Sequence, residues 1–147
     1  RPGRDAPAIT LADLARPEFR RIAIANPKHA PYGMRAVEAL KTAQVWDAVE
    51  RRLVYGENIA QAAQFVQTGN ADAGIIALAL APAFASSGSY TTIPAGLHQP
   101  LRQGFVLLKR GEGKALAQAF GDFFALPAVR DIMSRYGFST PGDAAIR

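Results

Sequence analysis

Short apolar segments alternate with segments of helical periodicity along this chain. Short runs of branched or small apolar residues, closed by turn residues, predict buried strands. Three such runs occupy residues 21–25, 51–55 and 73–77. Residues 90–94 and 103–108 have the same character, so we expect a fourth and a fifth strand there.

A helix is expected after each of the first two strands. Pro31 precedes the first helix, where its missing N–H costs little, and Asn58 is a suitable N-cap for the second. Apolar residues with helical spacing define one face of each helix. These faces are Met34, Val37, Leu40 and Ala43 in the first helix and Ile59, Ala62, Ala63 and Val66 in the second. Alternating strands and helices are typical of a mixed, mainly parallel sheet flanked by helices.

Further helices are expected on either side of this repeated unit. Thr10 and Asp13 have the spacing of a capping box, in which each side chain bonds the other residue's amide. Trp46 and Val49 are expected to continue a short turn, and residues 78–85 to form a helical stretch of small residues. After a turn at residues 111–113, a helix has the apolar face Leu116, Phe120, Phe123 and Phe124. Pro127 opens a last helix, which ends at Gly137.

Composition restricts the classes of function. The chain has 147 residues, of which 49% are hydrophobic, enough for one compact domain with its own core. Its formal net charge of +5 is dispersed along the chain, so we expect no nucleic-acid partner. Cysteine is absent, which excludes disulfides, thiolate metal sites and cysteine nucleophiles. No stretch has the ~18 apolar residues of a membrane span, and the first ten residues lack the apolar core of a signal peptide.

Candidate catalytic and metal-binding residues are few. His29 and His98 are the only histidines, and neither has an acid at metal-ligand spacing. Ser86, Ser87 and Ser89 lack the Gly-x-Ser-x-Gly context of a nucleophile. No pair of acids stands out for general acid–base chemistry. We therefore expect neither an enzyme nor a resident cofactor or metal ion.

Two strand-to-helix junctions are the informative feature of the sequence. Residues 25–33 and 55–60 each lead from a strand into a helix, and in a parallel sheet both loops lie at the carboxyl edge, where ligands bind. The first turn of each helix presents N–H groups without intrahelical partners and the positive end of the helix dipole. This geometry suits an anion and needs no charged side chain.

Five motifs at and around these junctions occur in a characteristic order. They are Ala25-Asn-Pro-Lys-His-Ala-Pro-Tyr-Gly33, Trp46-Asp47, Gly56-Glu-Asn-Ile59 with Gln61 and Phe65, Gly69-Asn-Ala-Asp-Ala-Gly74, and Arg135-Tyr-Gly-Phe138. In order and spacing they resemble periplasmic molybdate-binding proteins, the receptors of ABC-type oxyanion importers. The resemblance runs from about Pro7 to Phe138. It implies a type II periplasmic binding protein-like α/β fold, with the signal peptide and most of the first lobe upstream of this sequence.

The resemblance also implies which residues bind the ligand, molybdate or tungstate. Tyr32 and Ile59 match positions whose main-chain N–H groups bond the oxyanion, and the Tyr32 hydroxyl is a further donor. Ala77 stands where one branch of the family has a tyrosine ligand. The positions expected to surround the ligand are Asn26, Pro31, Gly33, Asn58 and Ala77.

Proteins of this kind have two lobes joined by a hinge, which implies a division of the chain. Residues 1–19 are expected to be a lead-in with the first hinge segment, residues 20–99 the second, oxyanion-binding lobe, and residues 100–147 a crossover strand and C-terminal helices of the incomplete first lobe. The expected compartment is the periplasm and the expected partner is the importer's membrane permease. The alternative is a truncated or repurposed domain of the same fold that senses an oxyanion or binds a protein.

The incomplete first lobe has one further consequence. Phe120, Phe123, Phe124 and the C-terminal helix would normally pack on the part of that lobe that this sequence lacks. An exposed apolar face of this kind favours association with another chain. We therefore expect the chain to self-associate through these residues.

Overall fold

The computed structural model describes residues 9–84 and 88–139. The chain forms two compact units, and the boundary between them falls between Leu101 and Arg102. The first unit contains the described strands and the helices that cover them, and the second contains helices and an irregular segment. The assignment of residues 20–99 and 100–147 to two different lobes stays a prediction.

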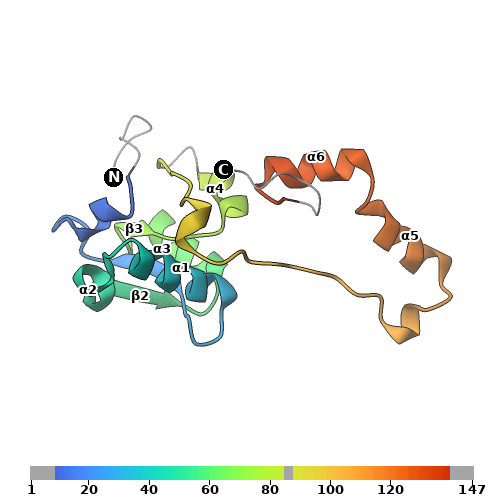
Figure 1. Ribbon diagram of the computed structural model, residues 1–147, viewed down its shortest axis with the longest axis horizontal. Coiled ribbons are helices and arrows are strands. Elements are labelled where there is room, and N and C mark those ends of the chain that lie inside the picture. Colours follow the sequence, from blue (N-terminus) through green and yellow to red (C-terminus); the bar gives the residue numbers. More distant parts are fainter. Residues whose placement is uncertain (1–8, 85–87, 140–147) are drawn as a thin grey trace. The chain divides into compact units, whose positions relative to one another are not determined.

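A three-stranded parallel sheet in the order β2-β1-β3 forms the centre of the first unit (Figure 1). The strands are β1 (Ile22–Ala25), β2 (Leu53–Gly56) and β3 (Ala73–Gly74). All residues of β1 are buried, as expected for a central strand covered on both faces. The register pairs Ala25 with Gly56 and Ala23 with Gly74, so the carboxyl ends of the strands lie at one edge. The predicted α/β fold with a helix-flanked parallel sheet is confirmed.

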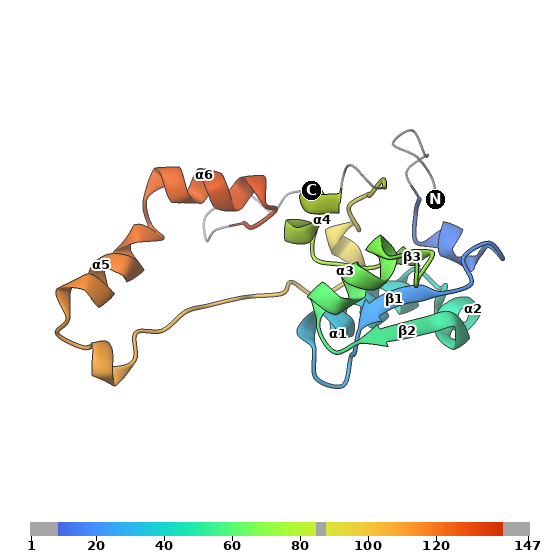
Figure 2. The ribbon, with the colours of Figure 1, turned by 180° about the vertical axis from the view of Figure 1, so that it is seen from behind.

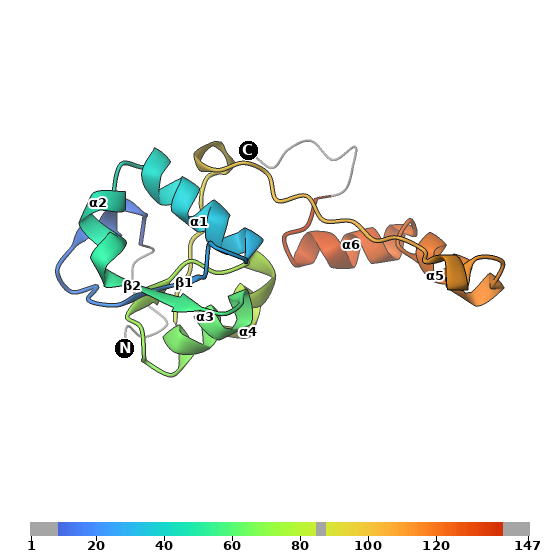
Figure 3. The same cartoon turned by 90° about the horizontal axis from the view of Figure 1, so that it is seen from below.

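Helices cover both faces of this sheet (Figure 3). The main helices of the first unit are α1 (Pro31–Thr42), α2 (Trp46–Val49) and α3 (Ile59–Gln67). On one face, Leu40 of α1 packs into the same buried cluster as Ile22. On the other face, Ala62 of α3 packs with Ala23. Because side chains alternate along a strand, Ile22 and Ala23 of β1 point to opposite faces and contribute to different cores.

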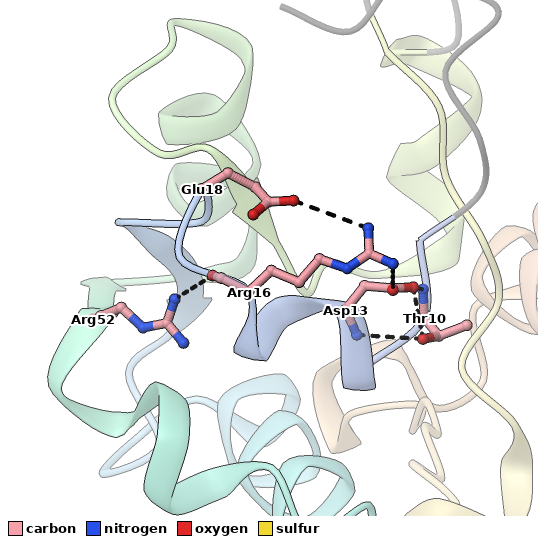
Figure 4. Close-up of polar contacts among 5 residues, drawn as sticks. All are labelled: Thr10, Asp13, Arg16, Glu18 and Arg52. Atoms are coloured by element: carbon pink, nitrogen blue, oxygen red, sulfur yellow. Dashed lines mark hydrogen bonds and ion pairs between the residues drawn. The ribbon is translucent and has the colours of Figure 1, made fainter.

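A lead-in segment is fastened to this unit by polar contacts (Figure 4). The two bonds predicted between Thr10 and Asp13 are confirmed, because Thr10 N donates to Asp13 Oδ2 at 2.7 Å and Asp13 N donates to Thr10 Oγ1 at 3.4 Å, but the N-cap of the short helix that follows is Leu11. The Arg52 guanidinium donates to the carbonyl oxygens of Arg16 at 2.8 Å and Phe19 at 2.6 Å.

The remaining short elements of the first unit are η1 (Ala12–Ala15), η2 (Glu50–Arg52), η3 (Leu78–Leu80), α4 (Ala81–Phe84) and η4 (Ala95–Leu97).

The second unit has an exposed apolar face. The helices of this unit are η5 (Lys109–Gly111), α5 (Ala115–Phe123) and α6 (Pro127–Arg135). The Phe124 ring contacts the rings of Phe105, Phe120 and Phe123, with centroids 5.0 to 6.1 Å apart. Phe120 is nevertheless 64% exposed and Leu116 84% exposed. No helix in the described part of the chain is long and apolar enough to span a membrane.

Two predicted strands and part of one predicted helix face are wrong. Residues 90–94 and 103–108 form no strand in the structure, and the described sheet is entirely parallel. A strand needs a neighbour to accept and donate its main-chain hydrogen bonds, and no described residues pair with these segments. In α1, Gly33 and Ala36 are buried while Met34 is exposed, because small residues allow the helix to lie close to the sheet.

Candidate functional site

Two helix starts meet at the carboxyl edge of the sheet. β1 and β2 run side by side (Figure 2), β1 leads through residues 26–30 into α1, and β2 leads through residues 57–58 into α3. Asn26 N donates to Gly56 O at 2.7 Å, which extends the pairing of the two strands into the loops. Tyr32 and Ile59 therefore lie in the first turns of two helices that begin at the same edge, as the sequence predicted.

The start of α1 has no side-chain cap. Its N-cap residue is Ala30, and Pro31, which has no N–H, is the first helical residue. Asn26 fixes the preceding loop, because its Oδ1 accepts from Lys28 N at 3.0 Å and its main-chain oxygen accepts from Ala30 N at 2.9 Å. Within residues 9–84 and 88–139, no group accepts a hydrogen bond from the amide of Gly33. That amide is available to a ligand.

Glycine at two positions allows both helices to begin directly against the ends of the strands. A Cβ atom on Gly33 would lie 2.1 Å from Ala25 O and 2.8 Å from Pro27 N. A Cβ atom on Gly56 would lie 2.7 Å from Ala62 N in α3. All of these neighbours are backbone atoms, so the first turn of each helix is held at the sheet edge by a contact that only glycine permits.

The start of α3 is capped in a way that leaves its first amide available. Asn58 is the N-cap, and its Oδ1 accepts from Gln61 N at 2.9 Å. Gln61 in turn accepts from Glu57 N through its Oε1 at 2.6 Å. In the part of the chain that the structure describes, the Ile59 amide donates to no protein group. The cap therefore fixes the loop and leaves the Ile59 N–H for a ligand.

A histidine side chain joins the two loops. His29 Nε2 lies 3.0 Å from the main-chain oxygen of Glu57 and 3.4 Å from its carboxylate Oε2. A carbonyl oxygen can only accept, so the Nε2 atom carries a proton and donates it to this contact. The β1–α1 loop is thus bonded to two consecutive residues at the end of β2, to Gly56 through Asn26 and to Glu57 through His29.

The other positions singled out by sequence lie around the same edge. Asn26, Pro31, Gly33 and Asn58 belong to the two loops and helix starts. Tyr32 is half-buried. Ala77 is buried on the segment that leaves β3, and its carbonyl accepts from Leu80 N at 2.9 Å at the start of η3. The roles of these residues in ligand binding stay predictions.

The donors described at the two helix starts are main-chain amides. No group of three or more His, Cys, Asp or Glu residues that could hold a metal ion occurs among the described residues. The carboxyls whose pKa is displaced lie outside the two loops: Thr10 lowers the pKa of Asp13 in the lead-in, and Arg35 and the Gln99 amide lower the pKa of Glu38 in α1. Main-chain N–H groups at helix starts bind anions without a formal charge.

Two residues that hold the site together were missed by sequence reasoning. The sequence excludes a metal-ligand spacing for His29, and nothing local indicates a partner 28 positions away. Gln61 stands three residues after Asn58, which is the spacing of a capping box, so its role in the loop had a detectable signal.

Comparisons with known sequences identify relatives of this chain. A family model described as bacterial extracellular solute-binding protein matches residues 1–139. The molybdate-binding protein ModA of Azotobacter vinelandii is 39% identical over 129 residues, which are 86% of this chain and 51% of that protein. ModA of Rhodobacter capsulatus is 38% identical over 136 residues, or 92% of this chain and 52% of that protein. The chain thus spans about half the length of the curated relatives it matches.

Solved structures of the same fold are found as well. The periplasmic molybdate-binding protein of Azotobacter vinelandii superposes with a TM-score of 0.76 at 32% identity, over 87% of this chain and 57% of that chain. A substrate-binding domain of a molybdenum ABC transporter protein from Clostridium difficile gives a TM-score of 0.71 at 19% identity. The second likeness shows the fold alone.

Proposed function

This chain belongs to the family of bacterial extracellular solute-binding proteins, and we propose that it is the oxyanion-binding part of a receptor that delivers molybdate or tungstate to an ABC-type importer. As a member of a solute-binding family it is not an enzyme. The proposed compartment is the periplasm and the proposed protein partner is the importer's membrane permease.

The observation that carries this proposal is the meeting of two helix starts at one sheet edge. In this proposal the main-chain amides of Tyr32 and Ile59 donate to oxygens of the anion, and the Gly33 amide and the Tyr32 hydroxyl are further donors at the same edge. Fixed neutral donors suit a tetrahedral oxyanion because several N–H and O–H groups satisfy its oxygens together. Selection between molybdate or tungstate and the smaller sulfate then rests on the size of the space between the donors.

The proposal includes a second lobe that completes the site. The chain spans about half the length of its curated relatives, and in the proposed mechanism the anion is enclosed between this lobe and the other half by a hinge motion. The hinge segments are proposed near Arg16 to Arg21 and Gln99 to Gln103. With only one lobe supplying donors, binding of molybdate to this chain is expected to be weak.

Two-dimensional NMR of the ¹⁵N-labelled chain, titrated with molybdate, tungstate and sulfate, tests the proposal, because it detects binding even when the Kd is in the millimolar range. Molybdate and tungstate should shift the amide signals of Tyr32, Gly33 and Ile59 more than any others, and sulfate should do so less. Signals at these residues that do not move, or larger shifts in another part of the chain, would overturn the assignment of the site.

The substitution Ile59→Pro removes the proposed donor and little else. Ile59 is the first residue of α3, where proline is tolerated, and Asn58 has an extended conformation, with φ −148° and ψ 176°, that is compatible with a following proline. The matched control Ile59→Ala removes the same side chain but keeps the N–H. Molybdate should bind Ile59→Ala but not Ile59→Pro, whereas equal affinities would exclude the Ile59 amide as a ligand donor.

We also propose that the isolated chain self-associates through the apolar face of the second unit. Leu116, Phe120 and Phe123 are exposed on α5, and Ile132 and Tyr136 are exposed on and after α6. Sedimentation velocity should show a mass that rises with concentration, and Phe120→Ser with Phe123→Ser should abolish that rise. A monomer at high concentration with α5 and α6 ordered would contradict self-association.

A further inference from the structure

We propose that His29 is a positioning residue that sets the separation of the two oxyanion-binding loops. Its Nε2–H group bonds the main-chain oxygen of Glu57 at 3.0 Å and so ties the loop before α1 to the loop before α3. This inference rests on the proposed function, because it concerns the same pair of helix starts.

The acceptor of this bond is itself held in place. Glu57 N donates to Gln61 Oε1 at 2.6 Å, and Gln61 N donates to the Asn58 side chain at 2.9 Å. The Glu57 peptide is therefore bonded to the first turn of α3, whose leading amide is that of Ile59. Through Glu57, the His29 ring is linked to the start of α3 and not merely to a neighbouring loop.

The donor side of the bond is fixed in the same way. The loop that contains His29 is closed by bonds from His29 N and Ala30 N to Asn26 O, at 3.3 and 2.9 Å. Ala30 is the N-cap of α1, one residue before Pro31. The bond to Glu57 thus runs between two loops that lead directly into the first turns of α1 and α3.

The main-chain contacts between the loops do not replace this bond. Asn26 N to Gly56 O joins the loops at their base, where they leave the paired strands. His29 supplies a side-chain bond to Glu57, the residue that follows Gly56, from a position three residues further along the β1–α1 loop than Asn26. Two contacts from different residues of this loop restrain it against the β2–α3 loop more than the main-chain contact alone.

The contact with the main chain of Glu57 also decides which substitutions can preserve it. The amide nitrogen of glutamine can occupy the place of the histidine Nε2 and donate to the same oxygen, whereas the shorter asparagine side chain can reach only the place of Nδ1. His29→Gln should therefore keep the bond, and His29→Asn and His29→Ala should lose it. His98, whose Nδ1 contacts the neighbouring Gln99 O at 2.9 Å, provides the control His98→Ala.

The experiment is a molybdate titration of each variant of the 147-residue chain, followed by the amide signals of Gly33 and Ile59. Without this bond the ligand has to restore the separation of the loops, at a cost of at most the net worth of one hydrogen bond, about 0.5 to 1.5 kcal/mol, which corresponds to a loss of affinity of up to about twofold to tenfold. We expect this loss in His29→Ala and His29→Asn, near wild-type affinity in His29→Gln, and no change in His98→Ala. In the ligand-free protein, imidazole ¹⁵N spectra should show a proton on Nε2 of His29.

The outcomes separate this inference from the proposed function. If molybdate leaves the wild-type amide signals unmoved, the proposed function fails and this inference fails with it. If the wild type binds while His29→Ala binds equally well, or if His29→Asn is as good as His29→Gln, the positioning role of His29 alone is overturned. A neutral His29 ring protonated only on Nδ1 would likewise overturn the bond on which the inference rests.

Discussion

Replacement of Gly33 by alanine tests whether the start of α1 is held against the end of β1 as the structure indicates. The added Cβ would lie 2.1 Å from Ala25 O, 2.7 Å from Ala25 C and 2.8 Å from Pro27 N. None of these atoms belongs to a flexible side chain, so no rotamer change can relieve the overlap. Either α1 or the β1–α1 loop has to move.

The size of the effect follows from two opposing contributions. Overpacking of a core by a methyl group costs about 1 to 3 kcal/mol, and contact with backbone places Gly33→Ala at the upper end, at about 3 kcal/mol. Alanine in a helix is favoured over glycine by about 1 kcal/mol. The net expectation is a free energy of unfolding lower by about 2 kcal/mol. With a typical urea dependence of about 1 to 2 kcal/mol per molar, the unfolding midpoint falls by about 1 to 2 M.

Urea unfolding followed by tryptophan fluorescence measures this shift of the midpoint in the first unit. Trp46, the only tryptophan, packs against the core cluster that contains Leu40 of α1. The matched control is Gly96→Ala, because a Cβ atom there would meet no atom within 4 Å, and its free energy of unfolding should stay within about 0.5 kcal/mol of the wild-type value. A Gly33→Ala protein as stable as the wild type would refute the close approach of α1 to β1.

Three further predictions concern residues that fix the first unit. Asn58→Ala should lower the free energy of unfolding by about 1 kcal/mol because the Gln61 amide loses its cap, while Asn58→Ser should retain most of the stability; equal urea midpoints for all three proteins would contradict this. Arg52→Lys should lower the free energy of unfolding by about 1 to 2 kcal/mol and speed amide exchange in residues 16–20. The guanidinium reaches the carbonyls of Arg16, Phe19 and Ala48 from separate nitrogen atoms, whereas the three donors of an ammonium share one nitrogen. The exposed Arg51→Lys is the matched control, and equal exchange in both variants would rule out these bonds as the attachment of residues 16–20. The Arg35 side chain and the Gln99 amide hold the pKa of Glu38 below its ordinary value of 4.5, so the stabilisation is present above about pH 4.5 and is lost as pH falls through the lowered pKa. Glu38→Gln should therefore flatten the acid side of the stability curve, measured as urea midpoints against pH, and an unchanged acid side would argue against this ion pair.

The parts of the fold that local signals specify could be predicted from the sequence. Pro31 and Asn58 mark the starts of α1 and α3 because the missing N–H of proline and the side-chain cap of asparagine act within one turn of the residue itself. The strand predicted at residues 21–25 is confirmed as β1 within one residue, since its flanking turn residues and apolar run are also local.

Features that depend on distant partners could not be predicted in the same way. Residues 103–108 have the apolar composition of a strand, but a strand also needs a neighbour, and Phe105 is 67% exposed. The buried face of α1 was misplaced because hydrophobicity favours Met34, whereas the close packing of helix on sheet favours Gly33 and Ala36. The bond between His29 and Glu57 joins residues 28 positions apart, and its existence depends on the parallel pairing of β1 and β2.

Small side chains connect the packing of this unit to its proposed chemistry. Ala23, Ala25 and Ala62 are fully buried, and Gly33 and Gly56 allow helix backbone to touch strand ends, so the first turns of α1 and α3 lie at the rim of the sheet and not above it. Amides placed there are fixed by the fold itself and pay no entropy of side-chain ordering when an anion binds. A long basic side chain in the same place would have to be immobilised by each ligand and would bind many anions of different size. In the proposed mode of binding, main-chain amides fixed by glycines and helix caps make the contact with the anion, and the net charge of +5 contributes long-range attraction.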